Sequence, residues 1–450
     1  MTDPADVLQR VDATDTELIR IVFVNNSGVP RGRVVDSETL PRILAEGANI
    51  TQAMQSFNAL DRLVADGQYG PAGEVRIVPD PATFTELPYA DRTAVMLADL
   101  HDLDGDRWAA GPRSQLREYL DDIGADGYEP KLSFESEFYY TETTDDGELV
   151  PFDDTTCFST DGMRSAHDLI RETIDALKTQ GMGLSAYYPE YGPGQQELVV
   201  DHATGVAASD SQVLFTETVK AVAAANNVGA TFRPHPFPEL PGTGCHVHLS
   251  LWQDGTNVLH DPDADGRYPL STRGRQFIGG LLEHAPALVA LTAPTVESYE
   301  RLAPGMWASA YTCWGYDNRE AAVRVPSVET DRPAATTRVE FKPADNTTNP
   351  YLAQLGLLAA GMDGIDRELD PGEPLNRDPS TVDDETLAER GIERLPTSLD
   401  EAVAALEADD VLATALGDAL HQSYLEVKQS EWAQSATEEG WDSAYLGRSF

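Results

Sequence analysis

The sequence predicts an α+β protein in which a small mixed domain precedes a larger one. Short β-rich segments separated by loops fill the region from Glu17 to about Asp104, and helical and strand patterns alternate after it. A chain of 450 residues with 41% hydrophobic residues can bury a large core and is long enough for at least two domains.

The N-terminal domain is expected over residues 1–107. Its strands are predicted in LIRIVFV and TAVMLADL, which lie between loops containing Gly, Pro and Asp. The stretch from Gly47 to Gly73 is long and polar, so it could reach another subunit or cover a site.

The second domain is expected over residues 108–450 and opens with an amphipathic helix from Arg113 to Gly124, whose final glycine suits the C′ position. Asn349 and Pro350 provide an N-cap and a first-turn proline for another helix. Neither the G-x-x-x-x-G-K-[ST] nor the G-x-G-x-x-G pattern occurs, so a nucleotide must be held in another way. Helices are predicted over residues 164–180, 210–227, 273–291, 349–369 and 398–428.

The charge balance excludes several classes of partner. Asp and Glu number 76 against 32 Lys and Arg, which gives a net charge of -44 spread along the chain. Nucleic acids and anionic membranes are therefore not expected as partners. Lysine is scarce, and this composition is typical of adaptation to high salt, although a merely acidic protein would also fit it.

The cysteines and the N-terminus indicate the compartment. The 3 cysteines are far apart and form no C-x-x-C pair, which argues against a disulfide framework or a thiolate zinc site. The N-terminus has no basic segment followed by an apolar run, and no segment approaches the length of a membrane span. We therefore expect a cytoplasmic protein.

Glutamates and histidines recur at a spacing of two on predicted strands. Glu135 and Glu137 in KLSFESEFYY project from one face of a strand, and His246 and His248 repeat the spacing in GTGCHVHLSLW. Taken alone, the glutamate pair could be a solvated strand face, and the histidine pair is ambiguous.

Two further segments supply charged residues. Glu190 and Glu197 flank a glycine-rich turn in PEYGPGQQEL, where a ligand can approach the backbone closely, although a surface turn would show the same pattern. Arg338, Glu340 and Lys342 alternate with apolar residues on one strand face. Carboxylates combined with one or two histidines favour a site for Mg²⁺ or Mn²⁺.

Arginines accompany these candidate ligands. Arg301, Arg319 and Arg324 provide planar forks that suit carboxylate or phosphate oxygens. Metal ligands near several arginines indicate phosphoryl transfer.

The ordered motifs of the chain resemble those of the glutamine synthetase family over about residues 20–365. The resemblance implies a β-grasp N-terminal domain and a catalytic domain in which helices flank a curved antiparallel sheet. It also implies a homo-oligomer, a dodecamer of two stacked hexameric rings with each active site between two subunits. The motifs are FESEF, E-x-x-P-G-Q-x-E, ATFRPHP, GTGCHVHLSLW, SYERLAPG, WGYDNREAAVRVP and RVEFKPADNTTNPYLA.

The resemblance also implies a role for each matching residue. The reaction it implies moves the γ-phosphoryl group of ATP to glutamate and then replaces phosphate with an amine, and Arg301, Arg319 and Arg324 are the implied catalytic residues. The implied metal ligands are Glu137, Glu190 and Glu197 beside glutamate, and Glu135, His246 and Glu340 beside the ATP phosphates. The implied binding residues are Gly242, Arg301 and Lys342 for glutamate, and His248, Ser250, Arg319, Arg324 and Arg338 for ATP.

The sequence departs from the family around the ammonium site. Glutamine synthetases carry an Asp-Gly-Ser-Ser stretch where this chain reads GANITQAMQSFNALDRL, and Trp307 replaces their flap glutamate. Two lost carboxylates weaken the binding of a small cation, whereas an indole can pack on an alkyl chain or face an amine cation. Lys342 stands where an arginine is usual. The first two changes predict a glutamate–amine ligase that uses an organic amine, such as putrescine or another polyamine.

Three alternatives stay open. An ordinary glutamine synthetase could bind ammonium through Asp61 or Asp66 of the N-terminal loop. A non-catalytic family member could sense ATP or glutamate, although it would have no use for a full set of metal ligands. A zinc hydrolase built on His246 and His248 would lack the H-E-x-x-H helix.

Overall fold

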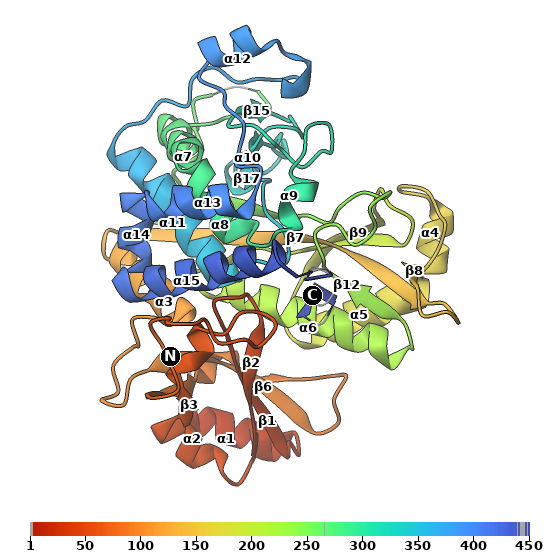
Figure 1. Ribbon diagram of the computed structural model, residues 1–450, viewed down its shortest axis with the longest axis vertical. Coiled ribbons are helices and arrows are strands. Elements are labelled where there is room, and N and C mark those ends of the chain that lie inside the picture. The colour runs from red at the N-terminus through yellow and green to blue at the C-terminus, as the bar shows by residue number, and fades with distance from the viewer. Residues whose placement is uncertain (1–2, 265, 439, 442–445, 448) are drawn as a thin grey trace.

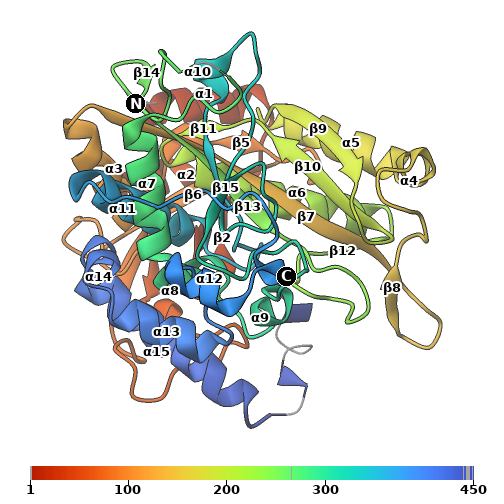
Figure 2. The same cartoon turned by 90° about the horizontal axis from the view of Figure 1, so that it is seen from above.

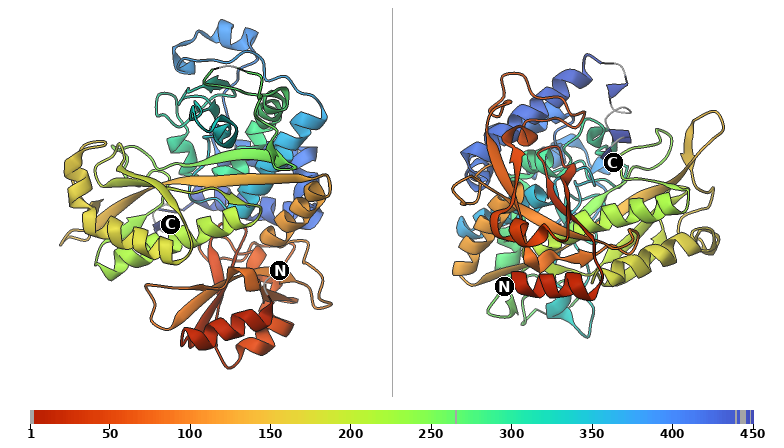
Figure 3. Two further views of the ribbon diagram at one scale, coloured as in Figure 1. Left: turned by 180° about the vertical axis from the view of Figure 1, so that it is seen from behind. Right: turned by 90° about the horizontal axis from the view of Figure 1, so that it is seen from below.

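The structure is a computed structural model that describes residues 3–264, 266–438, 440–441, 446–447 and 449–450. A smaller N-terminal sheet lies below a larger sheet and its helices in the view of Figure 1, and the view from behind in Figure 3 shows the same separation. This is the α+β fold that the sequence predicts.

The N-terminal sheet is mixed and has 6 strands in the order β2-β1-β6-β4-β3, with β5 paired to β6. β1 runs parallel to β6, with Leu18 opposite Thr93, and antiparallel to β2. β1 places Ile19, Ile21 and Phe23 in a core shared with α1 and α2. The elements are α1 Pro4–Ala13, β1 Leu18–Val24, β2 Pro30–Asp36, α2 Leu40–Glu46, β3 Ala48–Thr51, β4 Glu74–Pro79, β5 Thr85–Glu86 and β6 Thr93–His101.

The larger sheet has 11 strands and follows the main path β15-β16-β17-β13-β7-β10-β9. Its central strands are antiparallel, and Figure 2 shows how strongly β7, β10 and β13 curve. The strands are β7 Tyr128–Thr143, β8 Leu149–Pro151, β9 Leu184–Pro189, β10 Gln195–Val200, β11 Ala203–Thr204, β12 Gly229–Thr231, β13 Cys245–Gln253, β14 Thr256–Asn257, β15 Trp314–Tyr316, β16 Val323–Val325 and β17 Val339–Phe341.

Helices support the larger sheet. α11 is almost fully buried, and Asn349 caps it by accepting a hydrogen bond from the Tyr351 N–H at 3.0 Å, as predicted. The helices are α3 Pro112–Ala125, α4 Thr160–Ser165, α5 His167–Thr179, α6 Ala207–Ala225, α7 Thr272–Glu283, α8 Ala285–Thr292, α9 Ser298–Arg301, α10 Pro333–Thr336, α11 Pro350–Asp366, α12 Asp384–Glu389, α13 Leu399–Glu407, α14 Asp410–Leu416 and α15 Asp418–Ser435. None of the helices in the described ranges has both the length and the apolar character of a membrane span.

Several predicted helix limits were wrong. The helix expected over residues 398–428 is divided into α13, α14 and α15, because Asp409 caps α14 and Gly417 ends it with φ of 73°. The helix expected over residues 273–291 divides at His284. Gly124 lies inside α3, and Gly127, with φ of 83°, follows the helix end instead.

A buried ionic cluster joins the N-terminal sheet to the larger one. Arg113 on α3 contacts Asp80 at the end of β4, Asp99 on β6 and Asp210 on α6, each at 2.8 Å. Only 4% of the Arg113 side chain is exposed, so these carboxylates are satisfied inside the protein. The cluster ties the N-terminal sheet to α3 and α6 of the larger domain.

Candidate active site

The strand register brings the predicted residues to one place. In the antiparallel pairing of β13 with β7, His246 lies opposite Glu135. In the pairing of β13 with β17, His248 lies opposite Glu340. Because side chains alternate along a strand, these residues project from the same face of the sheet. Alternation along each strand predicted which side chains share a face, and the register of the three strands brings those side chains together.

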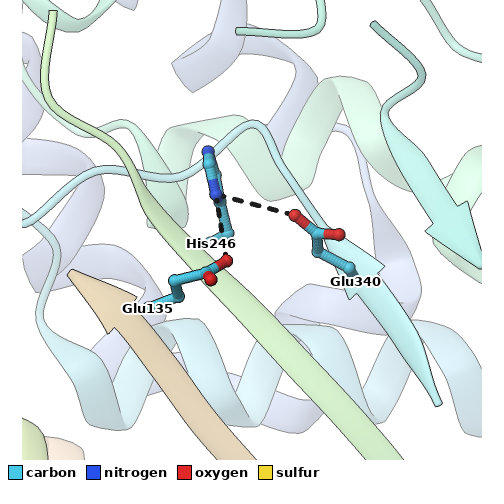
Figure 4. A group of neighbouring side chains, drawn as sticks. All are labelled: Glu135, His246 and Glu340. Carbon is cyan, nitrogen blue, oxygen red and sulfur yellow. Dashed lines mark ion pairs between the residues drawn. The ribbon is translucent and has the colours of Figure 1, made fainter. Parts of the chain in front are cut away.

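The first acidic group consists of Glu135, His246 and Glu340, each from a different strand. Figure 4 shows the three side chains converging on one point. His246 Nδ1 lies 3.5 Å from a Glu135 oxygen and 3.6 Å from a Glu340 oxygen. All three offer ligand atoms within 4.8 Å of one another, which suits a single cation.

Cationic and histidine side chains keep the carboxylates of this group ionised. Burial raises the pKa of Glu135, but hydrogen bonds from His246 and His248 outweigh it and hold that pKa well below its usual value. Burial likewise opposes ionisation of Glu340, but electrostatic interactions with Lys342, followed by His248 and His246, lower its pKa to about 2. The first acidic group is therefore anionic at neutral pH.

The second acidic group consists of Glu137, Glu190 and Glu197. Glu197 on β10 lies opposite Glu137 on β7 in the strand register, and Glu190 follows β9. The Gly244 N–H donates to Glu137 Oε2 at 2.7 Å, and the Tyr188 hydroxyl donates to Glu197. Glu190 Oε2 is buried and has no hydrogen-bond partner in the described part of the chain.

The second group behaves differently because its glutamates crowd one another. Burial raises the pKa of Glu190 to about 8, aided by the charges of Glu137 and Glu135 and partly offset by Arg319 and Lys342. Burial and the adjacent Glu135 also raise the pKa of Glu197 well above its usual value. A group of like charges of this kind is stabilised by a bound cation.

Predicted cationic residues surround the first group. Arg324 Nη1 donates to Glu340 Oε2 at 2.8 Å, and Lys342 Nζ lies 3.5 Å from Glu340 and 3.3 Å from His246 Nε2. Arg338 Nε donates to His248 Nδ1 at 3.1 Å, so His248 carries its proton on Nε2 and donates it to Glu135 at 3.0 Å.

The other predicted residues lie around this centre. Arg301 is 4% exposed and donates to the Ala344 carbonyl at 2.6 Å, and a Cβ on Gly242 would come within 2.7 Å of Arg301 Cγ. Ser250 accepts a hydrogen bond from the Trp252 indole at 3.0 Å. Arg319 is exposed but interacts electrostatically with Glu190. Trp307 is 62% exposed, on the loop between α9 and β15.

Sequence reasoning missed several residues that shape the site. Tyr188 and Gln195 bind the glutamates of the second group, and Gln195 also donates to the Gly242 carbonyl at 3.0 Å. Their short separation from Glu190 and Glu197 could have suggested a role. Glu320 accepts a hydrogen bond from the Trp307 N–H at 2.9 Å, and no local pattern links these two residues.

Asp61 and Asp66 of the N-terminal loop are not part of either acidic group in this chain. Asp61 forms an ion pair with Arg31 at 2.6 Å. The loop that carries both Asp61 and Asp66 contacts α15, where Arg62 pairs with Glu438 beyond the helix end and the Gln68 N–H donates to Glu426 at 2.7 Å.

Comparisons with known proteins agree with the fold. The glutamine synthetase N-terminal domain matches residues 4–108, and the glutamine synthetase catalytic domain matches residues 109–443. A glutamine synthetase of Halobacterium salinarum is 33% identical over 446 residues, which cover 97% of this chain and 95% of the relative. One of Methanocaldococcus jannaschii is 34% identical over 433 residues, with coverage of 94% and 93%.

Solved structures are equally similar. A crystal structure of a novel glutamine synthase homolog superposes with a TM-score of 0.84 at 33% identity and covers 95% of this chain and 97% of its own. A GmaS/ADP complex superposes with a TM-score of 0.84 at 31% identity and covers 98% and 99%. Both sheets and their helices are therefore shared with these proteins.

Proposed function

We propose that this chain, which belongs to the glutamine synthetase family of ATP-dependent ligases, joins the γ-carboxyl group of glutamate to an organic amine such as putrescine or another polyamine. The observation that carries this proposal is Trp307, an indole 62% exposed where the family has its flap glutamate. An indole cannot replace a carboxylate as the partner of ammonium, but it can pack on an alkyl chain. The similarity to GmaS, a γ-glutamylmethylamide synthetase, supports an amine substrate.

The family uses divalent metal ions, and the residues present fit them. Carboxylates with one imidazole form a donor set suited to Mg²⁺ or Mn²⁺, and the buried, unpaired Glu190 Oε2 is the kind of atom that a cation satisfies. In this proposal Glu137, Glu190 and Glu197 hold one ion and Glu135, His246 and Glu340 hold the other. When bound, the ions neutralise phosphate and carboxylate oxygens.

The protein side chains then position the reactants. Arg301 and the backbone at Gly242 hold glutamate, and position 242 must be glycine because a side chain there would collide with Arg301. Lys342 supplies a positive charge beside the bound glutamate. Arg319, Arg324 and Arg338 face the phosphates of ATP, with His248 and Ser250 farther along β13. The γ-carboxylate of glutamate attacks the γ-phosphorus, ADP leaves, and an amine expels phosphate from the resulting γ-glutamyl phosphate.

We further propose that the enzyme is a cytoplasmic homo-oligomer, a dodecamer of two hexameric rings, adapted to high salt. The free state of all three cysteines supports the compartment, and the exposed edge strand β2, where Val34 is 59% exposed, offers a surface for another subunit. Light scattering during size-exclusion chromatography in molar KCl tests the assembly.

The substrate is tested by metal-dependent phosphate release with ATP and glutamate in molar KCl, comparing ammonium with methylamine, ethanolamine, putrescine, spermidine and aniline. We expect kcat/KM to be highest for an organic amine. Ammonium outperforming every amine would overturn the proposal and favour the alternative, glutamine synthesis, which the names of the relatives support. In that case Asp61→Ala or Asp66→Ala should raise the KM for ammonium.

The variant Trp307→Glu is the sharpest control. It restores a carboxylate at an exposed loop position, so it should leave the fold intact and move the preference of the enzyme towards ammonium. No change in the ratio of ammonium to amine turnover would remove Trp307 from the specificity argument.

A further inference from the structure

Two loops of the larger domain meet beside the active site. The loop between α9 and β15 carries Trp307, and the turn between β15 and β16 carries Glu320. The Trp307 N–H donates to Glu320 Oε1 at 2.9 Å, and the Ser309 hydroxyl donates to the Ala321 carbonyl at 2.8 Å. These bonds hold Trp307 next to the Glu320 carboxylate.

The backbone around Trp307 is unusual. Trp307 has φ of 58° and Ser309 has φ of 66°, which are left-handed values that residues with side chains seldom adopt. The Glu320 contact helps to maintain this conformation, in which the indole stays 62% exposed. The indole is therefore presented to solvent beside a carboxylate, and it has not collapsed into the core.

Glu320 itself lacks a cationic partner. Within the described part of the chain, no Lys, Arg or His nitrogen comes within 4.0 Å of its carboxylate. Burial raises the pKa of Glu320, with an additional contribution from Asp378, and the Trp307 N–H and Lys342 lower it. A half-buried carboxylate in this position can gain substantially from a cationic ligand.

Glu320 is also connected to both acidic groups. Lys342, which interacts with Glu320 through its charge, contacts Glu340 and His246 of the first group. Arg319, the neighbour of Glu320 in the chain, interacts electrostatically with Glu190 of the second group. Electrostatic interactions of Glu320 and of its chain neighbour Arg319 therefore connect this part of the chain to both acidic groups.

We propose that Glu320 and Trp307 form a binding site for the cationic end of a diamine or polyamine, the end that does not react. Glu320 pairs with the distal ammonium group, and the Trp307 indole packs on the methylene chain that leads to the reacting nitrogen. This inference rests on the proposed function and narrows it, since a monoamine would have no group for Glu320 to bind.

The test is the variant Glu320→Gln. Glutamine keeps an oxygen that accepts the Trp307 N–H and removes only the charge, so the loop stays in place. We expect the KM for putrescine to rise about tenfold or more, the size of a lost charged hydrogen bond. The KM values for glutamate, ATP and butylamine, which has the same chain with one amino group, should change less than about twofold.

Asp378→Asn provides a matched control. It removes a negative charge that interacts with Glu320 but has no contact with Trp307, and asparagine can keep accepting the Ser380 N–H bond of 2.8 Å. Asp378→Asn should leave the KM for putrescine unchanged.

The outcomes separate the two proposals. If the wild type uses an organic amine best but Glu320→Gln raises the KM for putrescine and butylamine equally, or raises neither, the Glu320 site is wrong and the proposed function stands. If the wild type prefers a monoamine to every diamine, the Glu320 site is likewise wrong and the proposed function stands. A wild type that prefers ammonium to every amine overturns both.

Discussion

Binding of Mn²⁺ at the second acidic group should release protons. Burial and neighbouring carboxylates raise the pKa of Glu190 to about 8, and they raise that of Glu197 as well. At pH 7 Glu190 is therefore mostly protonated in the metal-free protein, and the raised pKa of Glu197 also favours its protonated form, whereas a metal ligand must be a carboxylate. Each proton must leave as the ion binds.

The raised pKa sets the size of the effect. Ionising Glu190 at pH 7 costs about 1.4 kcal/mol, and each further unit of acidity adds the same amount. The affinity for Mn²⁺ should therefore fall about tenfold per pH unit below pH 7 if one proton is displaced, and about a hundredfold if Glu197 loses another.

The pH dependence of folding stability has the opposite sign to that produced by an ordinary ion-paired glutamate. The folded metal-free protein binds more protons than the unfolded chain between the usual glutamate pKa of 4.5 and about 8. Its stability should therefore fall as pH rises through that window, and added Mn²⁺ should reverse the trend.

Isothermal titration calorimetry of Mn²⁺ binding at pH 7, in two buffers with different ionisation enthalpies, measures the released protons. We expect about one to two protons. Glu190→Gln should release fewer, and Glu142→Gln at the exposed end of β7 should match the wild type. Equal heats in both buffers, with an affinity that is constant from pH 6 to 8, would refute the protonated state assigned to this group.

Three further predictions concern stability. Arg113→Ala should lower the free energy of unfolding by about 3–5 kcal/mol in urea denaturation, since it leaves the buried Asp210 without its cation and leaves Asp80 and Asp99 with Arg117 alone. Arg92→Ala at an exposed pair should cost less than about 1 kcal/mol, and equal losses would contradict this prediction. His284 is paired with Asp409 at 2.6 Å and with Asp363 at 3.0 Å, and these carboxylates raise its pKa although burial opposes the shift. The contribution of His284 to the free energy of unfolding is therefore full below about pH 6.5 and is lost as pH rises through the raised pKa. His284→Asn should remove this pH dependence, and a wild-type curve that is already flat would count against it. With a net charge of -44, the thermal midpoint should rise between 0.1 M and molar KCl, where about 10 Å of screening length shrinks to about 3 Å, and a constant midpoint would argue against high-salt adaptation.

Residue alternation and sequence motifs carried most of the prediction of the candidate site. Glu135 and Glu137 share a strand face because side chains alternate, and the same rule places His246 and His248 together. The resemblance to glutamine synthetases then assigned these residues to two groups, and the register of β7, β13 and β17 brings the side chains together in that arrangement.

Features that depend on distant parts of the chain were not predictable. Nothing near Arg113 in the sequence indicates that Asp80 and Asp210 will surround it, because they come from opposite sides of a domain boundary. Helix limits failed for a related reason. Asp409 and Gly417 are compatible with a continuous helix on periodicity alone, and the packing of α14 decides that they cap it.

The two acidic groups show why residue type alone underdetermines chemistry. Glu340 and Glu190 are both glutamates in motifs of the same family, yet the pKa is lowered to about 2 in one and raised to about 8 in the other. The difference comes from Lys342, followed by His248 and His246, which lower the pKa of Glu340. Burial and the charges of Glu137 and Glu135 raise that of Glu190. The first group is already ionised and can bind a cation directly, whereas the second must release protons when a cation binds. Acid should therefore weaken cation binding at the second group first.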